Sequence, residues 1–189
     1  SLAVPGDLAA PGIPDDIVAR TLDRFGRLDI IVNNAALALP TRFPDLSAEE
    51  WRLALEVNMT APFLLIKAAF PAMKQQGYGR IINLCSLNGV NAHMGTAEYN
   101  SAKEALRALT RTAAREWAPH GITANVICPG AKTAASRAVF AEHPELEQMA
   151  DAANPMGRLG DPDTDIAPVA VFLAADDSRY LTGNTLFVD

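Results

Sequence analysis

The chain has 189 residues, of which 49% are hydrophobic and 20% charged, and its formal net charge is -6. This size suits one globular domain, and the acidic balance opposes binding to nucleic acid or to anionic lipid. No apolar run reaches the roughly 18 to 20 residues of a membrane span, and the N-terminus has no signal-peptide pattern, so we expect a cytoplasmic protein with no membrane partner.

The first half of the chain alternates short apolar runs with stretches of helical periodicity. A helix that ends at Gly26 precedes a strand at residues 28–32. Ser47 and Glu50 have the spacing of a capping box, which predicts a helix from about residue 48, and a second helical stretch covers about residues 62–76. Strand and helix therefore follow each other closely.

The second half repeats this alternation. In chain order we expect a strand at residues 81–85, a helix at about 96–119, a strand at 122–127, an irregular stretch at 131–161, a helix from near 165 and a last strand at 185–188. This order is typical of an α/β fold with a parallel sheet covered by helices. No repeat or linker divides the chain, so we expect a single domain over residues 1–189.

Cys85 and Cys128 are the two cysteines, and neither has the Cys/His spacing of a zinc site. Each stands at the end of an apolar run. We therefore expect two buried free thiols and no metal centre.

The most informative local pattern is Tyr99 and Lys103, one helical turn apart. A tyrosine with an ordinary pKa near 10 needs a neighbouring positive charge to act as a base at neutral pH, and an ammonium group can supply it. By itself the pair has a simpler interpretation, because this spacing also occurs by chance on solvated helix faces.

Further polar motifs follow the predicted strands. They are Asn33-Asn34-Ala35-Ala36 after the first strand, Asn58 within a helix, Ser86 after the second strand and Pro129-Gly130 after the third. Taken singly, an asparagine or serine of this kind could merely form a turn or a helix kink. Together with Tyr99 and Lys103, in this order, they resemble the short-chain dehydrogenase/reductase family from Gly6 to the end of the chain.

The resemblance implies a three-layer Rossmann-like fold and an NAD(P)-dependent oxidoreductase that interconverts a ketone and a secondary alcohol. Tyr99 then corresponds to the catalytic acid/base, and Lys103 to the residue that lowers its pKa and holds the nicotinamide ribose. Ser86 corresponds to the hydroxyl that hydrogen-bonds the substrate carbonyl. Asn58 corresponds to the residue that anchors a water connecting Lys103 to solvent.

The same resemblance implies contacts with the cofactor. Asp7 would lie near the adenine, Asn33, Ala35 and Ala36 beside the adenosine ribose, Pro129 and Gly130 at the nicotinamide, and Thr133 on the cofactor as well. Thr133 follows Pro129-Gly130 after two intervening residues, whereas the family commonly has three. His93 could be a second proton carrier or an exposed loop histidine.

The family begins with a strand, a glycine-rich turn and a helix that bind the dinucleotide pyrophosphate. The sequence contains no such glycine fingerprint, and Gly6-Asp7 matches a point inside the family's domain. We therefore expect the domain to be N-terminally incomplete, without its first βαβ unit and without the residue that separates NAD from NADP. Such a sheet would have an open edge at residues 28–32.

Two functions remain open on these grounds. One is the oxidoreductase acting on a small carbonyl or alcohol substrate, and the other is a noncatalytic scaffold or association module. Helices 62–76 and 96–119 match those that form a four-helix interface in the family, so we expect a homodimer or homotetramer. The sequence does not identify the substrate.

Overall fold

The computed structural model describes the backbone of residues 1–189 and every side chain except that of Ala135. The strands are β1 (Ile30–Asn33), β2 (Gly79–Leu84), β3 (Ile122–Pro129) and β4 (Thr185–Val188). The helices are α1 (Ile13–Phe25), α2 (Ala48–Leu55), α3 (Ala61–Gln76), α4 (Leu87–Asn91), α5 (Ala97–Trp117), α6 (Ala134–Glu142), α7 (Pro144–Ala153) and α8 (Ala167–Ala174).

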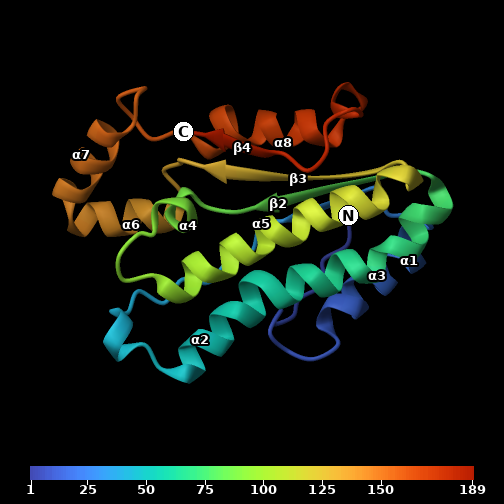
Figure 1. Cartoon of the computed structure of the whole chain (residues 1–189), viewed down its shortest axis with the longest axis horizontal. Coiled ribbons are helices and arrows are strands. Elements are labelled where there is room, and N and C mark those ends of the chain that lie inside the picture. Colours follow the sequence, from blue (N-terminus) through green and yellow to red (C-terminus); the bar gives the residue numbers. More distant parts are fainter.

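The four strands form one parallel sheet in the spatial order β1-β2-β3-β4. Helices α3 and α5 cover one face, with α1 packed on α3, and α8 covers the other face (Figure 1). The carboxyl ends of the strands point toward α4, α6 and α7 in the same view. The predicted α/β fold with three layers is confirmed.

Alternation along β2 explains how the two faces are filled. Ile81 belongs to the core cluster that contains Ile66 and Met73 of α3, whereas Ile82 packs with Leu173 of α8 on the opposite face. Successive side chains of a strand point to opposite faces, so an uninterrupted apolar run is what a doubly covered strand requires.

The predicted helix boundaries are confirmed where capping residues marked them. The Ser47 side chain accepts a hydrogen bond from the Glu50 amide, and Glu50 reaches back to the Ser47 amide, which begins α2 at Ala48. Gly26 ends α1 in the left-handed conformation. Cys85 and Cys128 are free and buried, as expected.

The expectation of an irregular stretch at residues 131–161 is wrong, because α6 and α7 lie within it. The sequence did contain their signals. Pro144 occupies the first turn of α7, followed by acidic residues and a run of good helix formers.

Helix α2 continues through a π-turn, Glu56–Thr60, into α3. The resulting helix, Ala48–Gln76, is long and apolar enough by length and composition to cross a membrane, so the expectation that no run has this length is wrong. In the structure this helix packs against α1, α5 and β2.

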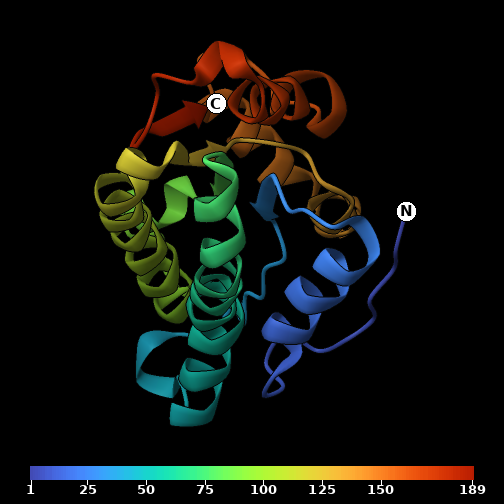
Figure 2. The ribbon, with the colours of Figure 1, turned by 90° about the vertical axis from the view of Figure 1, so that its right-hand side faces the viewer.

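Strand β1 is the outer strand on its side of the sheet, as expected. Ile30 and Val32 on it are 41% and 48% exposed. The segment before α1 does not pair with β1; it runs along the outside of α1, where Leu2 lies beside Arg20 and Arg24 (Figure 2).

Candidate active site

Tyr99 and Lys103 lie in the first two turns of α5, at the carboxyl end of β2. The Lys103 side chain is 2% exposed, and its Nζ donates a hydrogen bond to the Leu84 carbonyl oxygen at 2.8 Å. The same nitrogen is 5.6 Å from the centre of the Tyr99 ring. The helical spacing therefore does place both side chains on one face, as predicted.

Ser86 follows β2 and completes this group. Its Oγ accepts a hydrogen bond from the Asn88 amide at 3.1 Å, which makes Ser86 the N-cap of α4. Ser86 is also close enough to the Tyr99 hydroxyl to lower the pKa of that group. Ser86, Tyr99 and Lys103 thus converge outside the carboxyl end of a parallel strand, where ligands bind in open α/β sheets.

Burial shifts the pKa values of both Tyr99 and Lys103. Burial raises the pKa of Tyr99 above its ordinary value, while the interaction with Ser86 lowers it. Lys103 is itself buried, which lowers the pKa of its ammonium group, and its Nζ is directed to the Leu84 carbonyl.

Asn58 lies in the π-turn between α2 and α3 and is fully buried. Its Nδ2 donates to the carbonyl oxygens of Leu37 at 2.6 Å and Ala54 at 2.8 Å, and its Oδ1 accepts the Leu37 amide at 3.0 Å. The side chain therefore ties the segment after β1 to the long helix. π-turns of this kind are frequent at functional sites.

The residues expected near the adenosine lie at the end of β1. Asn33 is buried and its Nδ2 donates to the Asn83 Oδ1 at 2.7 Å, which links β1 to β2, while Ala35 and Ala36 are exposed. A small pocket of about 70 Å³ here is lined by Leu8, Val32, Asn33, Asn34, Ala35, Val57, Pro62 and Leu65. Asp7 is exposed nearby, and its Oδ1 accepts the Ala9 amide at 2.9 Å.

The residues expected near the nicotinamide lie at the end of β3. Gly130 donates its amide to Val188 at 2.8 Å and accepts one from Gly160 at 2.8 Å. Thr133 is the N-cap of α6, because its Oγ1 accepts the Ser136 amide at 3.2 Å.

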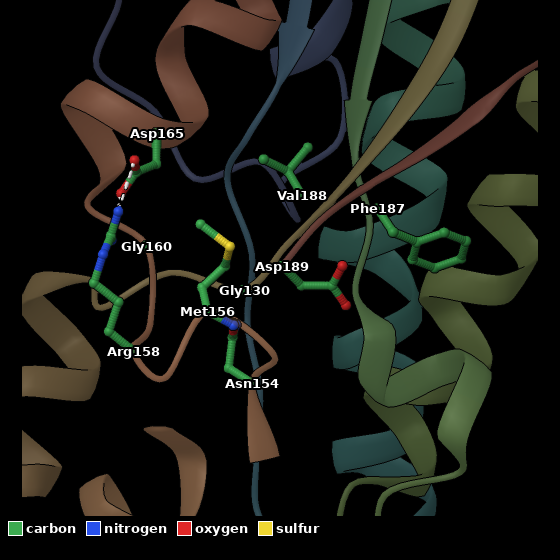
Figure 3. Close-up of a pocket in the computed structure, with 9 residues that line it drawn as sticks. All are labelled: Gly130, Asn154, Met156, Arg158, Gly160, Asp165, Phe187, Val188 and Asp189. Atoms are coloured by element: carbon green, nitrogen blue, oxygen red, sulfur yellow. Dashed lines mark hydrogen bonds and ion pairs between the residues drawn. The ribbon is translucent and has the colours of Figure 1, made fainter. Parts of the chain in front are cut away.

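A pocket of about 330 Å³ adjoins Gly130 (Figure 3). It is lined by Gly130, Asn154, Met156, Arg158, Gly160, Asp165, Phe187, Val188 and Asp189. Arg158 forms a two-pronged ion pair with Asp165, with N–O distances of 2.7 and 3.1 Å. Sequence reasoning missed this pocket, because four of its nine residues lie in the stretch that was expected to be irregular and the other five come from flanking segments.

Two further residues near Tyr99 differ in their environment. His93 is exposed, in agreement with the simpler of its two interpretations. Glu98, which sequence reasoning missed, is fully buried and accepts the Leu39 amide at 3.1 Å.

Comparisons with known proteins identify the family of the chain. Residues 1–189 match the family described as enoyl-(acyl carrier protein) reductase. The chain is 38% identical to an acetoacetyl-CoA reductase of Rhizobium meliloti over 90% of the chain and 70% of that protein. It is 34% identical to a 3-oxoacyl-[acyl-carrier-protein] reductase of Synechocystis, over 100% of the chain and 74% of the relative.

The chain belongs to the short-chain dehydrogenase/reductase family. A candidate gluconate dehydrogenase from Agrobacterium tumefaciens has the same fold, with a TM-score of 0.93, 35% identity and coverage of 100% of this chain and 74% of that one. A candidate NAD(P)-dependent gluconate 5-dehydrogenase from Beutenbergia cavernae, solved with bound NADP, has a TM-score of 0.92 and 33% identity, over 100% of this chain and 75% of its own. The protein is therefore an NAD(P)-dependent oxidoreductase of ketones and secondary alcohols.

Proposed function

We propose that the protein reduces a small ketone to a secondary alcohol, with Tyr99 as the proton donor. The observation that carries the proposal is the convergence of Ser86, Tyr99 and Lys103 at the carboxyl end of β2. Ser86 would hydrogen-bond the carbonyl oxygen of the substrate and hold it beside the Tyr99 hydroxyl. As the oxygen gains negative charge, Tyr99 would transfer its proton to it.

The raised pKa of Tyr99 agrees with a role as proton donor. A partly buried phenol with a pKa above its ordinary value is protonated at neutral pH, and only the protonated form can donate.

The nicotinamide cofactor would supply the hydride. An ammonium group has three N–H donors, and the structure directs one of them to Leu84, so Lys103 is suited to bind ribose hydroxyls with the others. Pro129 and Gly130 would border the nicotinamide, Asn33, Ala35 and Ala36 the adenosine ribose, and Asp7 the adenine, with Thr133 as a further contact. The sequence contains no glycine-rich turn that would bind the pyrophosphate.

Asn58 would anchor the water that connects Lys103 to solvent and so returns a proton to Tyr99 after each turnover. Its side-chain amide already makes three hydrogen bonds to Leu37 and Ala54. Those contacts support a fixed position for this turn of the helix, on which a relay depends.

We also propose a cytoplasmic homodimer or homotetramer, built from a single domain over residues 1–189. Helices α3 and α5 lie side by side on one face of the sheet, and Phe63 on α3 is 37% exposed. Their pairing with a second copy would cover apolar surface of this kind.

The test is Tyr99→Phe in the full-length protein. Loss of the proton donor is expected to lower kcat about 100- to 10,000-fold, while the Kd for NAD(P)H changes little. Turnover of acetoacetyl-CoA and of a keto-gluconate with NADH and NADPH measures the first quantity, and calorimetry the second.

Tyr180→Phe is the matched control, because Tyr180 is fully exposed at 102% and removing its hydroxyl should leave turnover unchanged. A Tyr99→Phe protein with wild-type kcat would refute the assignment. A wild-type protein that binds dinucleotide but turns over neither substrate class would favour the scaffold function.

A further inference from the structure

Glu98 has a buried carboxylate group with one unpartnered oxygen. Its side chain is 0% exposed, its Oε2 has no hydrogen-bond partner among the described residues, and it stands directly before Tyr99. Burying a carboxylate without a full set of partners is unfavourable. Its place in the first turn of α5 offsets part of this cost, since the helix N-terminus favours negative charge.

The other carboxylate oxygen holds the chain that follows β1. Glu98 Oε1 accepts the Leu39 amide at 3.1 Å, although the two residues are 59 positions apart. The backbone amides two residues before and after Leu39 also donate hydrogen bonds. Leu37 donates to Asn58 Oδ1 at 3.0 Å, and Thr41 donates to the Gly95 carbonyl at 2.9 Å.

Segment 37–41 is therefore a ribbon of chain whose amides are held at every second residue, at Leu37, Leu39 and Thr41. Pro40 has no amide proton, which suits the alternation. Thr41 forms a parallel bridge with Thr96, the N-cap of α5, so the ribbon is attached to the start of the helix that carries Tyr99. Glu98 supplies the central attachment of the three.

This arrangement joins two parts of the proposed active site. The ribbon continues from the residues proposed to border the adenosine ribose and ends at the turn before Tyr99. If its centre is released, segment 37–41 can move relative to the first turn of helix α5, which carries Tyr99. A displacement of about 1 Å at a reacting centre can lower the rate about 100-fold.

We infer that Glu98 is a positioning residue, whose buried carboxylate fixes segment 37–41 against helix α5 and thereby sets the distance between the bound carbonyl and Tyr99. The inference rests on the proposed function for its catalytic consequence. The attachment of segment 37–41 by Glu98 rests only on the hydrogen bond from the Leu39 amide to Glu98 Oε1.

The experiment compares Glu98→Ala with Glu98→Gln in the full-length protein. Glutamine keeps the oxygen that accepts the Leu39 amide and replaces only the unpartnered oxygen, so it is expected to rescue the function. Alanine removes the acceptor and should lower kcat/KM for the carbonyl substrate about 10- to 100-fold, with little change in the Kd for NAD(P)H. Glu116→Ala, on the exposed face of the same helix, is the control.

Amide hydrogen exchange gives a second readout that needs no turnover. Exchange at Leu39 should become faster in Glu98→Ala and stay slow in Glu98→Gln. Should the wild type turn over no substrate, the proposed function fails, but this exchange pattern still supports the attachment. Unchanged exchange at Leu39 in Glu98→Ala, or a loss of kcat/KM in Glu98→Gln as large as in Glu98→Ala, would overturn the role of the carboxylate oxygen.

Discussion

The chemistry of single residues here is governed by burial. Burial raises the pKa of Tyr99, lowers that of Lys103 and raises that of Cys85 to about 12. All three shifts favour the uncharged form of the group. Ser86 opposes the shift on Tyr99, so the phenol is tuned by a hydroxyl as well as by its surroundings.

A pH dependence follows from these directions. Because the proton donor is the neutral phenol, and its pKa lies above the ordinary 10.0, the reductive kcat should stay level from about pH 6 to pH 9. In Ser86→Ala, kcat should begin to fall at a higher pH than in the wild type, since the substitution removes the interaction that lowers the pKa of Tyr99. Steady-state rates at saturating cofactor measure both profiles, and a fall of the wild-type rate centred near pH 7 would contradict this assignment.

At the residue scale, the sequence predicted the pairing of Tyr99 with Lys103, which a local pattern marks. It did not predict the contact between Glu98 and Leu39, which no local pattern marks. Tyr99 and Lys103 are four residues apart on one helix, so periodicity alone brings them together. Glu98 meets Leu39 across 59 positions, and no local spacing predicts such a contact. The environment of Tyr99 was likewise beyond the sequence, because burial depends on the packing of distant elements.

At the scale of elements, the boundaries of helices and strands depend on a few backbone conformations. Gly77 ends α3 and Gly121 precedes β3, both with positive φ, at 67° and 74°. The two glycines meet: a Cβ on Gly121 would lie 2.2 Å from the Gly77 carbonyl oxygen, whereas a Cβ on Gly77 would have nothing within 4 Å.

This asymmetry predicts different costs for the same substitution. Gly77→Ala meets only left-handed strain and should lower the free energy of unfolding by about 1 kcal/mol. Gly121→Ala must also displace backbone, and we expect a loss of about 3 kcal/mol or more. Urea denaturation of both variants measures the difference, and equal losses would show that the close approach of the two turns is not maintained in solution.

Elements marked by an apolar run or a capping box were predicted from the sequence, and two surface helices were not. The apolar run of β2 and the capping box of α2 specify their elements locally. Helices α6 and α7 lie largely at the surface and were not predicted, although Pro144 and the acidic first turn of α7 were signals in the sequence. Strand β1 begins at Ile30 rather than residue 28, because its pairing with β2 sets the first bridged residue.

At the scale of the whole molecule, the sheet has an outer strand that carries apolar side chains. Ile30 and Val32 of β1 are both more than 40% exposed, and β1 has a hydrogen-bonded neighbour on one side only in the described sheet. Edges of this kind favour pairing with a further strand. Doubly wound nucleotide-binding folds hold the dinucleotide pyrophosphate against a glycine-rich turn at a helix N-terminus, and the sequence contains no such turn.

We therefore expect these 189 residues alone to bind dinucleotide weakly. The comparison is with a fusion in which a strand–turn–helix–strand unit with the glycine-rich turn of a doubly wound nucleotide-binding domain precedes Ser1. The added helix N-terminus would provide at least two charge-assisted hydrogen bonds to the pyrophosphate, each contributing about 1.5 kcal/mol, so its Kd should be lower by about 100-fold. Calorimetry with NADH and NADPH measures the ratio, and Lys103→Ala in the fusion should weaken binding again by removing the ribose contact. Equal affinity of the two chains would mean that the residues from Asp7 to Thr133 hold the cofactor without a phosphate-binding turn.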